Sequence, residues 1–79
     1  METKELVTNI VKELVDNSDS TSVKSIQSGS LTIFEINVVK DDVGKVIGKQ
    51  GRIILAIRTL VNAIGSKNGK RFLLEVPNS

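Results

Sequence analysis

The sequence contains no cysteine, no histidine, no tyrosine and no tryptophan. Without cysteine and histidine, disulfides, the usual zinc sites and mechanisms based on a thiol or an imidazole are excluded. Without tyrosine and tryptophan, most of the side chains on which nucleobases stack are missing. We expect the fold to be stabilised by packing alone, with no metal or cofactor.

Long hydrophobic runs are also missing, since no stretch reaches the roughly 18 apolar residues of a membrane span. The first fifteen residues carry Glu2, Glu5 and Glu13, which a signal peptide would not tolerate. The sequence therefore predicts a cytoplasmic protein with no membrane insertion. With 79 residues, 39% of them hydrophobic and 25% charged, it also predicts one globular domain over residues 1–79.

The charge is unevenly distributed along the chain. The formal net charge is only +2, yet residues 40–71 hold eight lysines and arginines against Asp41 and Asp42. The remaining residues hold three lysines against seven acidic residues. This concentration of positive charge favours a localised anion-binding face, and phosphate backbones are the commonest such anion. A solvated lysine-rich surface is the alternative interpretation.

Apolar spacing predicts three helices. Three- and four-residue steps predict a first helix over residues 4–16, and a second, short helix that Asp41 caps and that ends at Gly48. A longer apolar stripe follows Gly51 and predicts a third helix that stops at Gly65.

Three strands are predicted between and after these helices. Residues 23–26 and 31–39 are rich in β-branched side chains, and Gly29 between them allows the tight reversal of a hairpin. Side chains of the segment 71–76 are expected to point alternately to the two sides of a strand, with Phe72, Leu74 and Val76 on the same side. The order helix, strand, strand, helix, helix, strand predicts a two-layer α+β fold with a three-stranded sheet and helices packed on one face.

The segment between the second and third helices is the most informative for function. Gly48 and Gly51 flank Lys49 and Gln50, and such glycines allow close backbone approach and dihedral angles closed to other residues. The N–H groups and the positive dipole end of the next helix point toward this loop, and Lys49 and Arg52 add full charges. These features all favour a phosphate at the same place.

The segment VIGKQGR between two helices resembles the GXXG loop of KH domains, and residues 42–63 resemble the two-helix core of that family. The element order is that of the type II, bacterial KH arrangement, and the chain is similar to the small stand-alone bacterial KH proteins of the KhpA family. This resemblance implies a clamp on the backbone of about four unpaired RNA nucleotides. It also implies roles in post-transcriptional regulation, including small-RNA function and control of cell elongation or division.

The resemblance assigns roles to individual residues. It implies that the loop from Gly48 to Gly51 contacts the RNA backbone and that Arg52 lies near a phosphate. It also implies that four aliphatic side chains line an apolar groove on which bases lie: Val46, Ile47, Ile54 and Ile57. A purely structural role in the core is the alternative for these residues, and it is favoured for Ile57. Secondary candidates for RNA contact, with solubilising surface charge as the alternative, are Lys45, Arg58, Lys67, Lys70 and Arg71.

Other phosphate-binding loops do not fit the sequence. A Walker A loop needs four residues between its glycines and a hydroxyl after the lysine, whereas Gly44 to Gly48 encloses three residues and Gln50 follows Lys49. A dinucleotide fingerprint needs a strand before the glycines, where a short helix is predicted. The adjacent Asp41 and Asp42 suit helix capping better than acid–base chemistry. We therefore predict that the protein is not an enzyme.

Association with a second domain is the last expectation. Leu55 falls on the polar side of the third helix, beside Ile53, so this helix is the candidate dimer interface. The resemblance implies homodimers, and heterodimers with a larger KH-domain protein. Two other functions stay open: an adaptor that uses the fold only to bind proteins, and a small DNA-binding protein.

Overall fold

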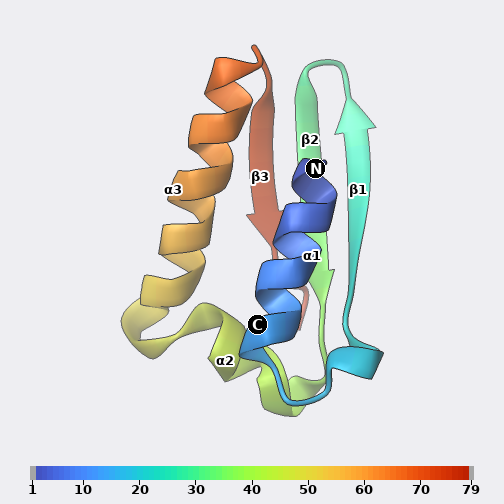
Figure 1. Cartoon of the computed structure of the whole chain (residues 1–79), viewed down its shortest axis with the longest axis vertical. Helices are drawn as coiled ribbons and strands as arrows, with labels where there is room; N and C mark the ends of the chain where they lie inside the picture. The colour runs from blue at the N-terminus through green and yellow to red at the C-terminus, as the bar shows by residue number, and fades with distance from the viewer. Residues whose placement is uncertain (1, 79) are drawn as a thin grey trace.

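The computed structural model describes residues 2–78, and its elements follow the predicted order (Figure 1). The helices are α1 (Thr3–Leu14), α2 (Val43–Ile47) and α3 (Arg52–Lys67). The strands are β1 (Ser22–Ser28), β2 (Leu31–Asn37) and β3 (Arg71–Glu75). Three single 3-10 turns, η1 (Ser18–Ser20), η2 (Lys40–Asp42) and η3 (Lys49–Gly51), join them. The prediction of an α+β fold with the type II KH order is confirmed.

The sheet has the order β1-β2-β3 and is mixed. β1 and β2 form the predicted hairpin, whose turn contains Gly29 at a φ of 61°. β3 pairs in parallel with β2, from Leu31 beside Arg71 to Glu35 beside Glu75. A parallel partner requires a crossover connection, which α2 and α3 provide. Both α1 and α3 pack on the same face of the sheet (Figure 1).

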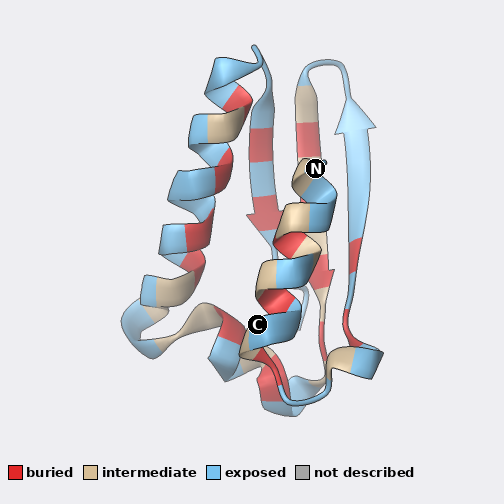
Figure 2. Cartoon of the chain, viewed as in Figure 1, coloured by how far each residue is buried: buried red, intermediate tan, exposed pale blue. Residues whose placement is uncertain are grey.

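The core lies between this face and the helices. Val7 and Val11 of α1 and Ile57 and Val61 of α3 meet Phe34 and Ile36 of β2, as the apolar spacing predicts. Along β2 and β3 the burial alternates, because successive side chains point to opposite faces (Figure 2). The rings of Phe34 and Phe72 pack at 5.2 Å between centroids. Both are buried, so neither offers a surface for base stacking.

Two local predictions need correction. Helix α3 does not stop at Gly65 but continues to Lys67. Gly65 is instead a close-contact position, where an added Cβ would lie 2.8 Å from the Lys70 carbonyl oxygen. Asp41 does not cap α2, since it is exposed, and no side chain makes a cap hydrogen bond at the start of that helix. The buried carboxylate is that of Asp42.

Candidate nucleic-acid interface

The loop between α2 and α3 has a backbone that glycine makes possible. Gly48 has φ 78° and ψ 172°, and Gly51 has φ 73° and ψ 16°, both in regions that L side chains rarely adopt. The loop is closed by a hydrogen bond of 3.1 Å from the Gly51 N–H to the Gly48 carbonyl. Gln50 also has a positive φ, of 58°. Three of four loop residues therefore hold a left-handed backbone.

Gly48 is also a point of close packing. A Cβ placed on Gly48 would lie 2.5 Å from Cγ1 of Ile53, in the first turn of α3. At Gly51, by contrast, an added Cβ would meet nothing within 4 Å. The first glycine is needed for both its backbone conformation and its small size, and the second for its conformation alone.

The start of α3 brings positive charge to this loop. α3 is sixteen residues long, so its first N–H groups and its dipole make its N-terminus a favourable place for an anion. The side chains of Lys49, Gln50 and Arg52 at this end are exposed. The loop lies at one end of α3 (Figure 1), where the side chains of Lys49 and Arg52 present two cations to solvent.

The aliphatic side chains predicted to line a groove divide into two groups. Val46 is fully buried and Ile54 is only 4% exposed, and Ile57 is also in the core. In this conformation their side chains pack inside the domain and offer no apolar surface to a base. Ile47 and Ile53 are half-buried at the edge of the core and remain accessible beside the loop.

The buried carboxylate of Asp42 holds the start of α2, the helix that leads into the loop, against the segment after α1. Asp42 accepts hydrogen bonds from the Asn17 N–H at 3.0 Å, from Asn17 Nδ2 at 3.1 Å and from the Asp16 N–H at 3.3 Å. Burial by itself would raise the pKa of Asp42, but these bonds and one from Lys45 Nζ outweigh it and lower the pKa. The carboxylate ties the segment after α1 to the start of α2.

The structure separates the secondary candidates. Lys45 forms ion pairs with Asp16 at 3.0 Å and Asp42 at 3.4 Å, which raise its pKa, so its charge is already engaged. Arg58 lies against β3, with Nη2 3.5 Å from the Leu74 carbonyl oxygen. Lys67, at the end of α3, and Lys70 lie at the opposite end of α3 from the loop. Arg71 lies on the sheet face opposite Phe72, because side chains alternate along the strand.

The candidate dimer residues also differ from each other. Leu55 is 60% exposed on α3, as its position off the apolar stripe predicts. Ile53 is half-buried, and its side chain packs against Gly48 of the loop. Of this pair, Leu55 is the more available to a partner.

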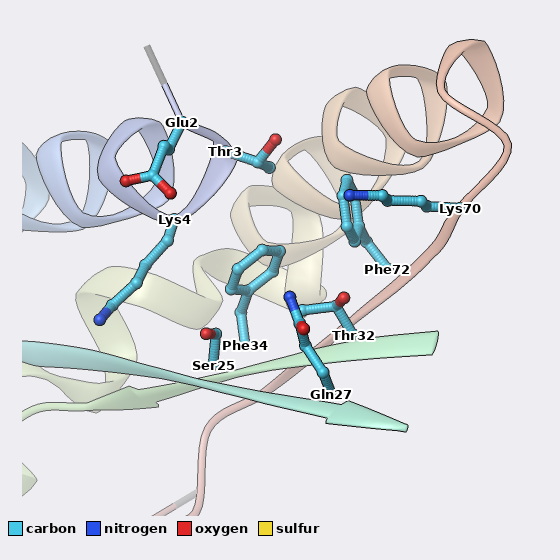
Figure 3. A pocket seen from close by; sticks show the side chains of 9 residues that line it. All are labelled: Glu2, Thr3, Lys4, Ser25, Gln27, Thr32, Phe34, Lys70 and Phe72. Carbon is cyan, nitrogen blue, oxygen red and sulfur yellow. The ribbon is translucent and has the colours of Figure 1, made fainter. Parts of the chain in front are cut away.

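A hollow of about 260 Å³ lies far from the loop, over the hairpin end of the sheet (Figure 3). Its lining includes Lys4 of α1, Gln27 of β1, Thr32 of β2 and Lys70 before β3. Of the predicted site residues it contains Lys70 alone, so it is distinct from the GXXG loop. Among residues 2–78, no cluster of side chains suits a metal ion, and no helix has the length and apolar character needed to cross a bilayer.

The fold and this loop define a class of protein. A three-stranded mixed sheet, helices on one face and a glycine-bracketed loop between two helices are the features of a type II KH domain. The family model described as "KhpA/KhpB, KH domain" matches residues 4–76, and the chain belongs to this family. It is not an enzyme family, which confirms that part of the sequence-based prediction.

Curated relatives cover nearly the whole chain. The "RNA-binding protein KhpA" of Listeria monocytogenes EGD-e is 47% identical over 73 residues, which are 92% of this chain and 96% of the relative. The protein of the same name from Caldanaerobacter subterraneus is 51% identical over 72 residues, covering 91% and 96% of the two chains. That from Aquifex aeolicus is 48% identical over 73 residues, 92% of each chain. No solved structure matches the sequence.

Proposed function

We propose that this chain, acting as a single KH domain, binds a short unpaired segment of RNA through its GXXG loop. The observation that carries the proposal is the left-handed loop from Gly48 to Gly51, which meets the N-terminus of α3 beside two exposed cations. The name of the curated relatives, RNA-binding protein, supports the choice of ligand. With RNA as the ligand, we also propose a cytoplasmic location.

In the proposed complex, the loop backbone approaches the sugar-phosphate chain, since Gly48 and Gly51 carry no side chain there. The N–H groups at the start of α3 and the side chains of Lys49 and Arg52 contact phosphates. Ile47 and Ile53, half-buried next to the loop, provide the apolar surface for bases. Arg58, held beside the Leu74 carbonyl, is the candidate for a contact further along α3.

Binding by one domain is expected to be weak. Phe34 and Phe72 are buried, and aromatic stacking, which adds about 1–3 kcal/mol per base in other proteins, is not available to this domain. Phosphate contacts are sequence-independent, so selectivity is modest as well. We therefore propose that the protein acts with a second KH domain, its own or that of a larger partner, and that Leu55 on α3 contributes to this contact. An RNA chaperone or post-transcriptional regulator would need only such broad, additive binding.

The role of the loop in RNA binding can be tested by introducing two carboxylate side chains into it. Lys49→Asp with Gln50→Asp places negative charge where phosphate is expected, at exposed positions that leave the core unchanged. A matched control, Lys4→Asp with Asn9→Asp, makes the same change in net charge at exposed positions of α1, away from the loop. Titration of fluorescent single-stranded oligoribonucleotides at one stated salt concentration should show at least tenfold weaker binding, roughly 1.4 kcal/mol, for the loop variant only.

Two results would contradict the proposal. Equal losses in both variants would mean that RNA senses overall charge and not the loop. Unchanged binding in both, with cellular function retained, would favour the alternative of an adaptor that uses the KH fold only for protein association. Parallel titrations with single- and double-stranded DNA test the remaining alternative, a DNA-binding protein.

A further inference from the structure

The hollow over the hairpin end of the sheet is lined by polar side chains that have no partner in the described part of the chain (Figure 3). Beside the rings of Phe34 and Phe72, its lining consists of these polar residues: Glu2, Thr3, Lys4, Ser25, Gln27, Thr32 and Lys70. Among residues 2–78, none of their side chains takes part in a hydrogen bond or an ion pair. Polar groups that gather in a recess are normally hydrogen-bonded, so water or a ligand must complete these.

Thr32 gives the clearest sign that the hollow is built to hold something. The residue is only 5% exposed, and its hydroxyl has no hydrogen-bond partner among residues 2–78. In the same residues, no buried side-chain oxygen without a partner is sealed off from solvent, so this hydroxyl must open into the hollow, as Figure 3 shows. Valine would have a similar shape here without the cost of a buried hydroxyl. Packing of the sheet therefore does not account for a threonine at this position.

The electrostatic character of the hollow favours an anion. Helix α1 begins over it, and the first N–H group that bonds within this helix is that of Leu6, to the Glu2 carbonyl at 3.0 Å. The N–H groups before Leu6 have no acceptor in the helix, and no side chain caps them. Lys4 and Lys70 add two positive charges to the lining, against the single negative charge of Glu2.

The donors reach the hollow from three elements. The first turn of α1 lies on one side, and Gln27 of β1 and Thr32 of β2 point toward it from the sheet (Figure 3). Lys70 extends over the Phe72 ring from the segment before β3, where its N–H is anchored to the Gly65 carbonyl at 2.8 Å. Donors on several sides suit a tetrahedral oxyanion better than a planar carboxylate, whose two oxygens lie on one side of the group.

We propose that this hollow binds the phosphate group of a small molecule, either inorganic phosphate or a phosphomonoester. Its volume of about 260 Å³ is below the ~300–1,000 Å³ of sites that enclose a drug-sized ligand. The phosphate group therefore enters the hollow, and the rest of a larger molecule, such as the nucleoside of a nucleotide, stays in solvent. The site lies away from the GXXG loop, and its occupation does not require RNA.

Titration of the whole protein, followed in ¹H–¹⁵N spectra, tests the site. Inorganic phosphate, adenosine monophosphate and adenosine are added separately, with sodium chloride adjusted to keep the ionic strength constant. We expect saturable shifts of the amides of residues 3, 4, 27, 32 and 70, with a Kd of roughly 1 mM for phosphate. Adenosine monophosphate should shift the same amides and adenosine should not. The phosphate alone against the nucleotide distinguishes the two sources of the phosphate group.

The GXXG loop can also meet free phosphate, so its amides, residues 48–52, are followed separately. Lys49→Asp with Gln50→Asp should remove the shifts of the loop and leave those of the hollow. Failure of the proposed RNA site and failure of this site are therefore told apart in one set of spectra.

Single substitutions test the residues of the hollow. Lys70→Gln should weaken phosphate binding at least about fivefold, and Thr32→Val, which keeps the shape of the side chain, about fivefold through the loss of one donor. The matched control Lys12→Gln removes a positive charge at an exposed position of α1 outside the hollow and should bind as before. The proposal is overturned if the amides of the hollow show no saturable shift, if adenosine acts as strongly as its monophosphate, or if Lys70→Gln and Lys12→Gln lose equally.

Discussion

Replacing each loop glycine by alanine should have clearly different effects on stability. Gly48→Ala adds a Cβ that lies 2.5 Å from Ile53 Cγ1, at a φ and ψ that non-glycine residues rarely adopt. We expect about 1–3 kcal/mol of backbone strain and a similar cost of overpacking, a loss of roughly 3 kcal/mol or more. Gly51→Ala meets no atom within 4 Å and carries only the left-handed backbone cost of about 1–2 kcal/mol.

Thermal unfolding followed by far-ultraviolet circular dichroism is the suitable assay, because the chain has no tryptophan or tyrosine for fluorescence. For a domain of this size each kcal/mol lowers Tm by about 4–8 °C, so Gly48→Ala should lose ~12 °C or more and Gly51→Ala roughly half of that or less. Adding Ile53→Ala to Gly48→Ala removes the contacts with Cγ1 and Cδ1 and leaves the one with Cβ at 2.8 Å, so the two changes should be less than additive by about 1 kcal/mol. Equal Tm losses at the two glycines, or full additivity with Ile53→Ala, would refute the close-packing argument.

Four further predictions concern stability. Gln50→Val should cost about 1 kcal/mol, because β-branched residues tolerate a positive φ poorly, whereas Gln50→Asn should be neutral in the same unfolding assay. Gly65→Ala should destabilise by roughly 1–3 kcal/mol, because its Cβ would press on the Lys70 carbonyl and the Phe72 ring; an unchanged Tm would show that the strand start shifts freely. The pKa of Asp42 in the folded protein lies below its ordinary value of 3.8. The ionised carboxylate therefore stabilises the folded state fully above pH 3.8, and this stabilisation is lost as pH falls through the folded-state pKa. Asp42→Asn should flatten this acid decline in Tm, and an unchanged slope would contradict the role of the carboxylate. The pKa of Lys45 is raised, so this residue affects stability at high pH. The contribution of its ion pairs to folding stability is complete below pH 10.5 and is lost as pH rises through the folded-state pKa.

The element order could be predicted because each element buries one regular apolar pattern. The three- and four-residue steps of α1 and α3 and the alternation of β2 and β3 correspond to the buried residues of the structure, except at Leu60 of α3, which the apolar stripe includes but which is 45% exposed. The glycine spacing of the loop similarly indicated its left-handed backbone. These features are local in sequence, so sequence analysis can find them.

The roles that sequence reasoning missed depend on residues far apart in the chain. Asp42 and Asp41 are chemically identical, and only packing shows that Asp42 meets the backbone of Asp16 and Asn17, 25 residues or more away. Val46 and Ile54 would suit a groove as well as a core, and the docking of α2 on α3 decides for the core. For Arg71 a signal was present, since the alternation that buries Phe72 already directs Arg71 to the other face.

The parallel pairing of β3 has a consequence for how the protein is made. β3 joins β2 across forty residues of sequence, from Leu31 to Arg71, whereas the β1–β2 hairpin closes within a few residues. During translation, the amide and carbonyl groups on the β3 side of β2 therefore have no strand partner until the ribosome has released residues 71–75. Nascent chains stalled before this point should be sensitive to proteases and prone to pair with other strands.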